Sequence, residues 1–230
     1  MVVVRSANAT PCPQRFARNA MPATPCPQRF VRGANSDHAL RGFTMYEVEL
    51  KFAVAEPGKL RQRVLDLGGT AVGVVEQHCD TYYAHPCRDF KQTTEALRIR
   101  SVDGHYHITY KGPKRAGVVK TRQELEWSLG ADDPDGENMS TLLVSLGFQP
   151  VATVTKHRET LELHRQGQDL KVTFDEVAGV GSYSEIEAIA EQESQIAAAR
   201  EAILQFAEEL GLTAPEPRSY LNLLLNCQKK

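Results

Sequence analysis

The chain has 230 residues, of which 41% are hydrophobic and 24% are charged, a composition typical of a folded globular protein. No apolar run approaches the roughly eighteen residues that a membrane-spanning helix needs, so we expect a cytoplasmic protein without membrane contact. The five cysteines show neither CxxC spacing nor a secretory signal, which argues against a disulfide framework and a zinc site.

The first 44 residues differ in composition from the rest. The octapeptide ATPCPQRF occurs at 9–16 and again at 23–30, and six arginines stand against one acidic residue, Asp37. This predicts a disordered or non-native N-terminal extension over residues 1–44, with an organelle transit peptide as the alternative. Residues 45–230 then form the folded domain. They contain 21 basic and 28 acidic residues, a net charge of −7 that disfavours nucleic-acid binding.

The folded part opens with MYEVELKF at 45–52, a strand pattern in which charged and apolar residues alternate. Successive side chains of a strand point to opposite faces, so the charged residues share one side and the apolar residues share the other. Three later segments have helical periodicity: 57–67, the region near 134–148, and 191–210. The sequences at 67–81 and 146–160 match at an offset of 79, which indicates two related halves.

Six later segments repeat the alternation of the first strand, and two arrangements of a sheet can explain it. In one, an antiparallel sheet turns its charged face to water. In the other, the sheet closes into a barrel with its charged faces inward and with helices covering the apolar outside. Ladders such as Glu-x-Glu-x-Lys, Arg-x-Arg and Lys-x-Arg favour the barrel, because solvated strand faces usually mix in more uncharged polar residues.

A charged interior implies a ligand, because a buried ion without a partner costs on the order of several kcal/mol. The basic residues that would converge on a polyanion are Lys51, Arg98, Arg100, Lys111, Arg122, Lys156 and Arg158. Arginine offers bidentate geometry suited to phosphate oxygens. The glutamates at 47, 49, 185 and 187 would repel such a ligand unless a divalent cation lay between them, and hard oxygen donors suit Mg²⁺ or Mn²⁺.

The chain resembles the CYTH domain family, also called the triphosphate tunnel metalloenzymes. EVELK corresponds to the family's ExExK signature, and LRIR, TYKGP, RQELE, TKHR, SEIE and EPRSYLNLLL follow in the family's order. The resemblance extends from Met45 to about Leu225. It implies an α+β fold, in which an eight-stranded antiparallel β-barrel carries amphipathic helices outside, and an enzyme that acts on a triphosphate with Mg²⁺ or Mn²⁺. Dimers are common in the family, so a homodimer is possible.

The resemblance also implies roles for individual residues. The metal-binding carboxylates would be Glu47, Glu49, Glu185 and Glu187, with Glu126 and Asp175 as further candidates. The triphosphate clamp would consist of Arg98, Arg100, Lys111, Lys156 and Arg158, joined by Lys51 and Arg122. Glu124 would support these cations. In thiamine triphosphatases a Tyr and a Lys manage protons near the attacking water, which implies catalytic roles for Lys111 and for Tyr82 or Tyr83.

Three functions remain open on this basis. MYEVELKF and PEPRSY resemble class IV adenylyl cyclases, which form cyclic AMP and pyrophosphate from ATP. DTYYAHP resembles thiamine triphosphatases, so a hydrolase of thiamine triphosphate or inorganic tripolyphosphate is the alternative. A non-catalytic polyphosphate-binding module is the third possibility, although the complete set of four glutamates argues against it.

Overall fold

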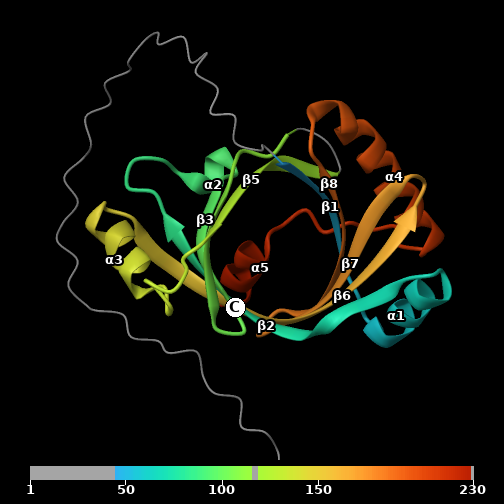
Figure 1. Ribbon diagram of the computed structural model, residues 1–230, viewed down its shortest axis with the longest axis horizontal. Coiled ribbons are helices and arrows are strands. Elements are labelled where there is room, and N and C mark those ends of the chain that lie inside the picture. The colour runs from blue at the N-terminus through green and yellow to red at the C-terminus, as the bar shows by residue number, and fades with distance from the viewer. Residues whose placement is uncertain (1–44, 116–118, 229–230) are drawn as a thin grey trace, which may run out of the picture.

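The computed structural model describes residues 45–115 and 119–228, so the predicted extension over 1–44 lies outside the described residues. In the described ranges, eight strands form one closed antiparallel barrel in the order β1-β5-β4-β3-β2-β6-β7-β8 (Figure 1). The strands are β1 (Met45–Ala53), β2 (Thr70–Ala84), β3 (Ala96–Val102), β4 (His105–Lys111), β5 (Lys120–Ser128), β6 (Gln149–Arg165), β7 (Gln168–Val177) and β8 (Gly181–Ala190). The predicted fold class is confirmed.

Six helical segments connect and cover the strands described here. They are α1 (Pro57–Asp66), α2 (Phe90–Thr93), α3 (Glu137–Ser145), the 3₁₀ turn η1 (Glu193–Gln195), α4 (Ile196–Glu209) and α5 (Tyr220–Cys227). The three helices expected from periodicity correspond to α1, α3 and η1 with α4. None of the described helices has the length and apolar character to cross a membrane.

The alternation in β1 separates the interior of the barrel from its outer core. Val48, Leu50 and Phe52 point outward and are at most 3% exposed, because the helices α4 and α1 cover this side of the barrel. Ile203 and Phe206 of α4 belong to the same apolar cluster. The intervening charged residues of β1 point inward and are also buried. Of the two arrangements considered, the barrel with a charged interior is therefore the one the chain adopts.

The two related halves meet at the pairing of β2 with β6. β2 begins at Thr70 and β6 at Gln149, which reproduces the offset of 79 in the sequence. The two strands lie next to each other and run antiparallel, and β1 and β5 form the corresponding pair on the other side of the barrel. If β1, β2, β3 and β4 are exchanged for β5, β6, β7 and β8, respectively, the order of strands around the closed barrel stays the same. The weak internal repeat is thus a pseudo-twofold arrangement of the barrel.

The last helix, α5, closes one end of the barrel. In Figure 1 it lies inside the outline of the strands. Ser219 caps its N-terminus by accepting a hydrogen bond from the Asn222 amide at 3.2 Å. Tyr220 and Leu223 then pack against inward-facing apolar side chains such as Val154. This contact joins residues far apart in the sequence. The helix covers one end of the tunnel and does not cover the opposite end.

Candidate functional site: a charged tunnel

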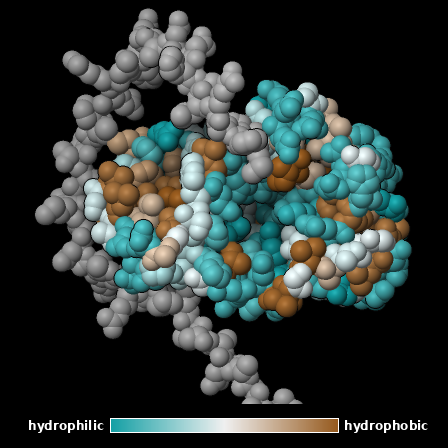
Figure 2. Space-filling view, in the orientation of Figure 1, coloured by the Kyte–Doolittle hydropathy of each residue, from teal (hydrophilic) through white to brown (hydrophobic). Residues whose placement is uncertain are grey.

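The interior of the barrel is a polar cavity of about 330 Å³. Figure 2 shows hydrophilic side chains around the hollow at the centre of the barrel. Ten basic residues line it: Lys51, Arg98, Arg100, Lys111, Lys114, Lys120, Arg122, Lys156, Arg158 and Lys171. Six glutamates line it as well: Glu47, Glu49, Glu124, Glu126, Glu185 and Glu187. All seven predicted clamp residues and five of the six predicted metal ligands therefore face one space.

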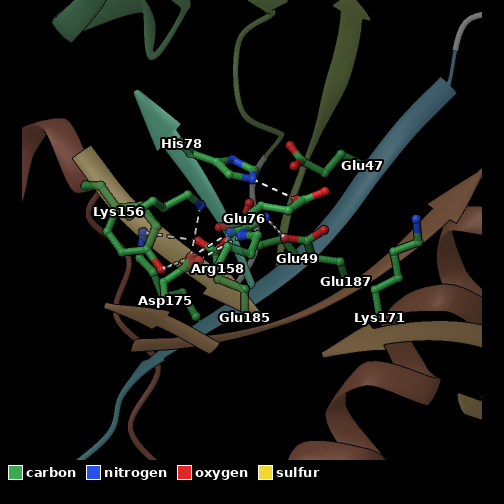
Figure 3. Close-up of polar contacts among 12 residues, drawn as sticks. Glu47, Glu49, Glu76, His78, Lys156, Arg158, Lys171, Asp175, Glu185 and Glu187 are labelled. Carbon is green, nitrogen blue, oxygen red and sulfur yellow. Dashed lines mark hydrogen bonds and ion pairs between the residues drawn. The ribbon is translucent and has the colours of Figure 1, made fainter. Parts of the chain in front are cut away.

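Four glutamates come together because β1 and β8 are neighbouring antiparallel strands. Glu49 lies opposite Glu187 in the register of this pair, and Lys51 lies opposite Glu185. Figure 3 shows the Glu49 and Glu187 side chains on the same side of the sheet, with Glu47 one step along β1. Each glutamate is at least partly neutralised by a cation; Lys120 Nζ, for example, lies 2.6 Å from Glu49 Oε1.

The pKa values of these glutamates record how crowded the negative charges are. Burial, together with the charges of Glu185, Glu47 and Glu49, raises the pKa of Glu187 to about 8, although Arg158 acts in the opposite direction. Burial and Glu185 also act to raise the pKa of Glu49, but Lys120 and Lys51 outweigh them and hold it at about 2.

The carboxylate set suits a hard divalent cation. Closely spaced buried carboxylates repel one another, and Mg²⁺ and Mn²⁺ prefer oxygen donors of this kind. Among the described residues, no three His, Cys, Asp or Glu side chains already converge on one point. Glu49, Glu185 and Glu187 would therefore hold a cation after giving up part of their contact with lysine and arginine. Glu47 would complete the set.

Two buried aspartates each orient a pair of cations in the tunnel wall. Asp80 accepts hydrogen bonds from Arg98 at 3.1 Å and from Arg100 at 2.6 and 2.8 Å. Asp175 accepts from Lys156 at 3.0 Å and from Arg158 at 2.7 and 2.6 Å. Each aspartate lies behind the cavity lining and holds two cations that face it, so both act as supports.

The two further metal candidates, Asp175 and Glu126, lie in different surroundings. Asp175 accepts hydrogen bonds from Lys156, Arg158 and the Tyr220 hydroxyl, the last at 2.7 Å, which favours a supporting role, and its metal role stays a prediction. Glu126 lines the tunnel and accepts a hydrogen bond from Thr109 Oγ1 at 2.7 Å, and its metal role stays a prediction.

The two tyrosines considered as catalysts point to opposite faces of β2. Tyr82 lines the tunnel, as Arg98 does. Tyr83 packs in the apolar cluster outside the barrel, and its hydroxyl donates to Ser140 Oγ of α3 at 2.9 Å. The structure therefore brings Tyr82 together with the other site residues, whereas Tyr83 packs outside the barrel, and the catalytic role of either tyrosine stays a prediction.

Lys111 is held as a cation at the centre of this arrangement. Its Nζ lies 2.7 Å from both carboxylate oxygens of Glu47 and 2.8 Å from Glu124. Burial acts to lower the pKa of Lys111, but the charges of Glu47 and Glu124 outweigh it, so the pKa lies above its ordinary value. The supporting role expected for Glu124 agrees with this contact. A protonated Lys111 suits the binding of phosphate oxygens.

Sequence reasoning missed five charged or aromatic residues at the tunnel, which are Lys114, Lys120, Lys171 and Tyr220 in its lining and Asp80 behind it. Lys120 stands two positions before Arg122 and shares its face, so extending the alternation of β5 by one step would have found it. Asp80 lies on a strand whose two faces are both partly polar, which hides the alternation. Lys114 follows the end of β4. Tyr220 reaches the tunnel only because α5 folds back into the end of the barrel, and nothing local in the sequence signals this.

Comparison with known protein families matches residues 45–220 to the CYTH domain. The chain belongs to the CYTH domain family. It is 36% identical over 143 residues to "Putative adenylate cyclase MJ0240" of Methanocaldococcus jannaschii, covering 62% of this chain and 77% of that protein. It is 30% identical over 190 residues to the thiamine-triphosphatase of Macaca fascicularis, covering 75% of this chain and 80% of that protein.

A solved structure from another organism has the same architecture. The PH1819 protein from Pyrococcus horikoshii OT3 superposes with a TM-score of 0.67 at 38% sequence identity, and the match covers 78% of this chain and 98% of that one. The CYTH match begins at Met45, where the first strand begins, and ends at Tyr220, which opens α5. The family model therefore covers all eight strands of the barrel.

Proposed function

We propose that this CYTH protein is a divalent-metal-dependent enzyme that binds a triphosphate in the tunnel and cleaves one of its phosphoanhydride bonds. The observation that carries the proposal is the convergence of ten basic side chains on a closed tunnel that also holds four neighbouring glutamates. Phosphoryl transfer needs fixed geometry and positive charge where negative charge develops, and preorganised cations supply both. When bound, Mg²⁺ or Mn²⁺ would neutralise phosphate oxygens and polarise the phosphorus.

The residues of this chain divide the remaining work. Arg98, Arg100 and Arg158 bind phosphate oxygens with guanidinium groups that Asp80 and Asp175 already orient. Holding the guanidinium groups in place before binding reduces the reorganisation needed during the reaction. Lys111 adds a point charge. The closed wall of the barrel limits the water around the phosphates, which strengthens each of these contacts.

Adenylyl cyclase chemistry is the first candidate. In that reaction the ribose 3′-hydroxyl of ATP attacks the α-phosphorus and pyrophosphate leaves. The 36% identity to a protein named as an adenylate cyclase supports it, together with the MYEVELKF opening. Pyrophosphate as a leaving group needs cations on its oxygens, and the pair Arg98 and Arg100 of β3 and the pair Lys156 and Arg158 of β6 offer them.

Triphosphate hydrolysis is the second candidate, and a specific observation favours it. Tyr82 and Lys111 both line the tunnel, and they also line a second space that joins it. A phenol and an ammonium group at such a junction can orient water against a terminal phosphorus. The 30% identity to thiamine-triphosphatase supports this reading.

One experiment separates the candidates. Purified protein is incubated with Mn²⁺ or Mg²⁺ and, separately, with ATP, thiamine triphosphate and inorganic tripolyphosphate, and the products are resolved by chromatography. Cyclic AMP with stoichiometric pyrophosphate establishes the cyclase, whereas orthophosphate without cyclic AMP establishes the hydrolase. Lys111→Met should lose the activity, while Lys59→Met, which removes an exposed lysine of α1, should keep it. No product from any substrate would leave only a binding module.

A further inference from the structure

The charged side chains that line the tunnel are poorly suited to take up a proton. Hydrolysis of a triphosphate releases a proton from the attacking water, and a base placed beside that water accelerates the step. Lys111 is held as a cation by Glu47 and Glu124, and arginine stays protonated in proteins. Glu49 and Glu185 are each engaged by a cation of the wall. A neutral side chain with a free lone pair would complete the site.

His78 of β2 is a neutral base beside the tunnel cations. It stands four positions before Tyr82, which lines the tunnel, so it projects from the same inner face of the strand. The residue is only 5% exposed, and it lies opposite Lys156 in the register of β2 with β6. Burial and the charge of Arg100 lower the pKa of His78 to about 4, although Glu76 acts in the opposite direction. The imidazole is therefore neutral at pH 7.

The two ring nitrogens of His78 differ in their surroundings. Nε2 lies 3.0 Å from Glu76 Oε2, and an ionised carboxylate can only accept, so Nε2 carries the proton of the neutral ring. Nδ1 is then an acceptor, and it is buried without a hydrogen-bond partner in the part of the chain that the structure describes. Buried polar atoms are almost always hydrogen-bonded, so this lone pair calls for a donor that arrives with the substrate. Figure 3 shows the His78 ring turned toward the Glu76 carboxylate.

Glu76 links the buried imidazole to the solvent. Its side chain is 44% exposed, and it lies opposite Arg158 in the register of β2 with β6. A carboxylate bound to one nitrogen of an imidazole orients the ring and stabilises the imidazolium that forms when the other nitrogen takes up a proton. A base that is itself held by a third group is a recurrent arrangement in enzymes that activate a nucleophile.

The position of His78 along β2 indicates which end of the phosphate chain would react. His78 and Tyr82 are four residues apart, which corresponds to about 13 Å along a strand. One water molecule cannot contact both side chains. A base at His78 serves the phosphorus held by Lys156 and Arg158, and it leaves Tyr82 at the other end of the phosphate chain.

We propose, on the basis of the function proposed above, that His78 is the catalytic base of triphosphate hydrolysis and that Glu76 is its positioning residue. Water attacks the phosphorus held by Lys156 and Arg158. A bond forms between the water oxygen and phosphorus, and the bridging P–O bond breaks, its electron pair passing to the oxygen of the leaving phosphate group. The water proton passes to His78 Nδ1. Glu76 stabilises the imidazolium until the proton leaves with the products.

The test compares turnover with binding in matched variants. His78→Gln keeps an N–H group near Glu76 and removes the base, and Glu76→Gln removes the negative charge behind the ring. His157→Gln and Glu176→Gln are the controls, because these two exposed residues lie opposite each other on the outer faces of β6 and β7. Orthophosphate release is measured with whichever triphosphate the wild type hydrolyses, and tripolyphosphate binding is measured by calorimetry. Circular dichroism melting confirms that each variant is folded.

We expect His78→Gln to lower kcat about a hundredfold, as the loss of a general base predicts, and Glu76→Gln to lower it about fivefold. Tripolyphosphate should bind to both variants no more weakly than to the wild type. Added imidazole should raise kcat of His78→Ala and not that of the wild type. The controls should change neither turnover nor binding. If His78→Gln fails to fold, Glu76→Gln decides, because it alters only a half-exposed side chain.

Three results would overturn the inference. The first is a kcat of His78→Gln within about threefold of the wild type. The second is a loss of binding as large as the loss of turnover, which is the mark of a structural role. The third is a loss of turnover in Tyr82→Phe, or in His107→Gln, that His78→Gln does not share. His107 is included because it lies opposite Arg100 and its Nδ1 also has no partner among the residues described.

The same measurements keep this inference distinct from the function on which it rests. A wild type that forms cyclic AMP and releases no orthophosphate from any triphosphate overturns the role of His78 and leaves the proposed function standing. A wild type that cleaves no triphosphate overturns both.

Discussion

Replacing Asp175 by Asn tests whether this aspartate holds the tunnel wall together. The Asp175 side chain is completely buried and accepts hydrogen bonds from Lys156, Arg158 and the Tyr220 hydroxyl. Asn has nearly the same shape but no charge, so Lys156 and Arg158 lose their common buried counter-ion. Removing one partner of a buried ion pair costs about 3 to 5 kcal/mol, because an uncompensated charge stays behind. For a domain of this size the midpoint of thermal unfolding should fall by about 10 °C.

The matched control lies on the same strand. Asp169 of β7 pairs with His164, and its side chain is 95% exposed. Exposed ion pairs contribute about 1 kcal/mol or less, so Asp169→Asn should leave the unfolding free energy nearly unchanged. Tyr220→Phe removes only the hydroxyl that reaches Asp175 and should cost about 1.5 to 3 kcal/mol, as expected for a hydrogen bond to a charged group. Urea unfolding at pH 7 measures all three variants.

The pH dependence of the unfolding free energy tests the contacts of Asp175 in a second way. Burial acts to raise the pKa of Asp175, but Arg158 and Lys156 outweigh it and hold the pKa well below its ordinary value. The contribution of Asp175 to stability is therefore present above its unfolded-state pKa of about 4 and is lost as the pH falls through the lower folded-state value. The stability difference between the wild type and Asp175→Asn should shrink below pH 4. A loss under 1 kcal/mol at pH 7, or a loss equal to that of Asp169→Asn, would refute the supporting role.

Three further predictions concern the ligands. Lys111→Met should lower kcat/KM by about a hundredfold or more when corrected for folded protein, because it removes a preorganised cation from the tunnel; a change under threefold would contradict this. Burial, with Lys120 and Arg122, lowers the pKa of Lys114 to about 8, so this cation is lost as the pH rises through 8. Tripolyphosphate binding, followed by calorimetry, should weaken from pH 7 to pH 9. The weakening should be smaller in Lys114→Arg, which stays charged, and not abolished, because Lys156 titrates in the same range. Mn²⁺ should tighten tripolyphosphate binding in the wild type and not in Glu49→Gln; an equal effect in both proteins would exclude Glu49 from the metal site.

The period-two alternation of side chains made most of the tunnel predictable from the sequence. Once the charged face of β1 is taken as the inner face, the inward residues of β3, β6 and β8 follow by counting every second position. The same rule distinguishes Tyr82 from Tyr83, since only Tyr82 shares a face with Asp80. A choice between the two tyrosines was thus available in the sequence once β2 was taken as a strand.

The residues that sequence reasoning missed depend on contacts between distant segments. β2 was not found as a strand by alternation, because its outward residues near the tunnel, such as Cys79 and Thr81, are not strongly apolar. Tyr220 enters the tunnel through the packing of α5 on Val154 and Val177, which belong to other strands. The hydrogen bond from the Tyr220 hydroxyl to Asp175 follows from that packing. Local periodicity carries no information about a helix that returns to close a barrel.

The charge balance of the tunnel explains why a metal and a triphosphate should need each other. With every side chain ionised, the ten lining cations exceed the six lining glutamates and the two supporting aspartates by two charges. A triphosphate ester carries about four negative charges at neutral pH, because only its terminal phosphate has a second ionisation, near pH 6. The triphosphate alone would leave about two uncompensated negative charges in a poorly solvated space, and the divalent cation alone would leave about four positive ones, which is costly in both cases. A triphosphate together with one divalent cation brings the balance to zero, so each should strengthen the binding of the other.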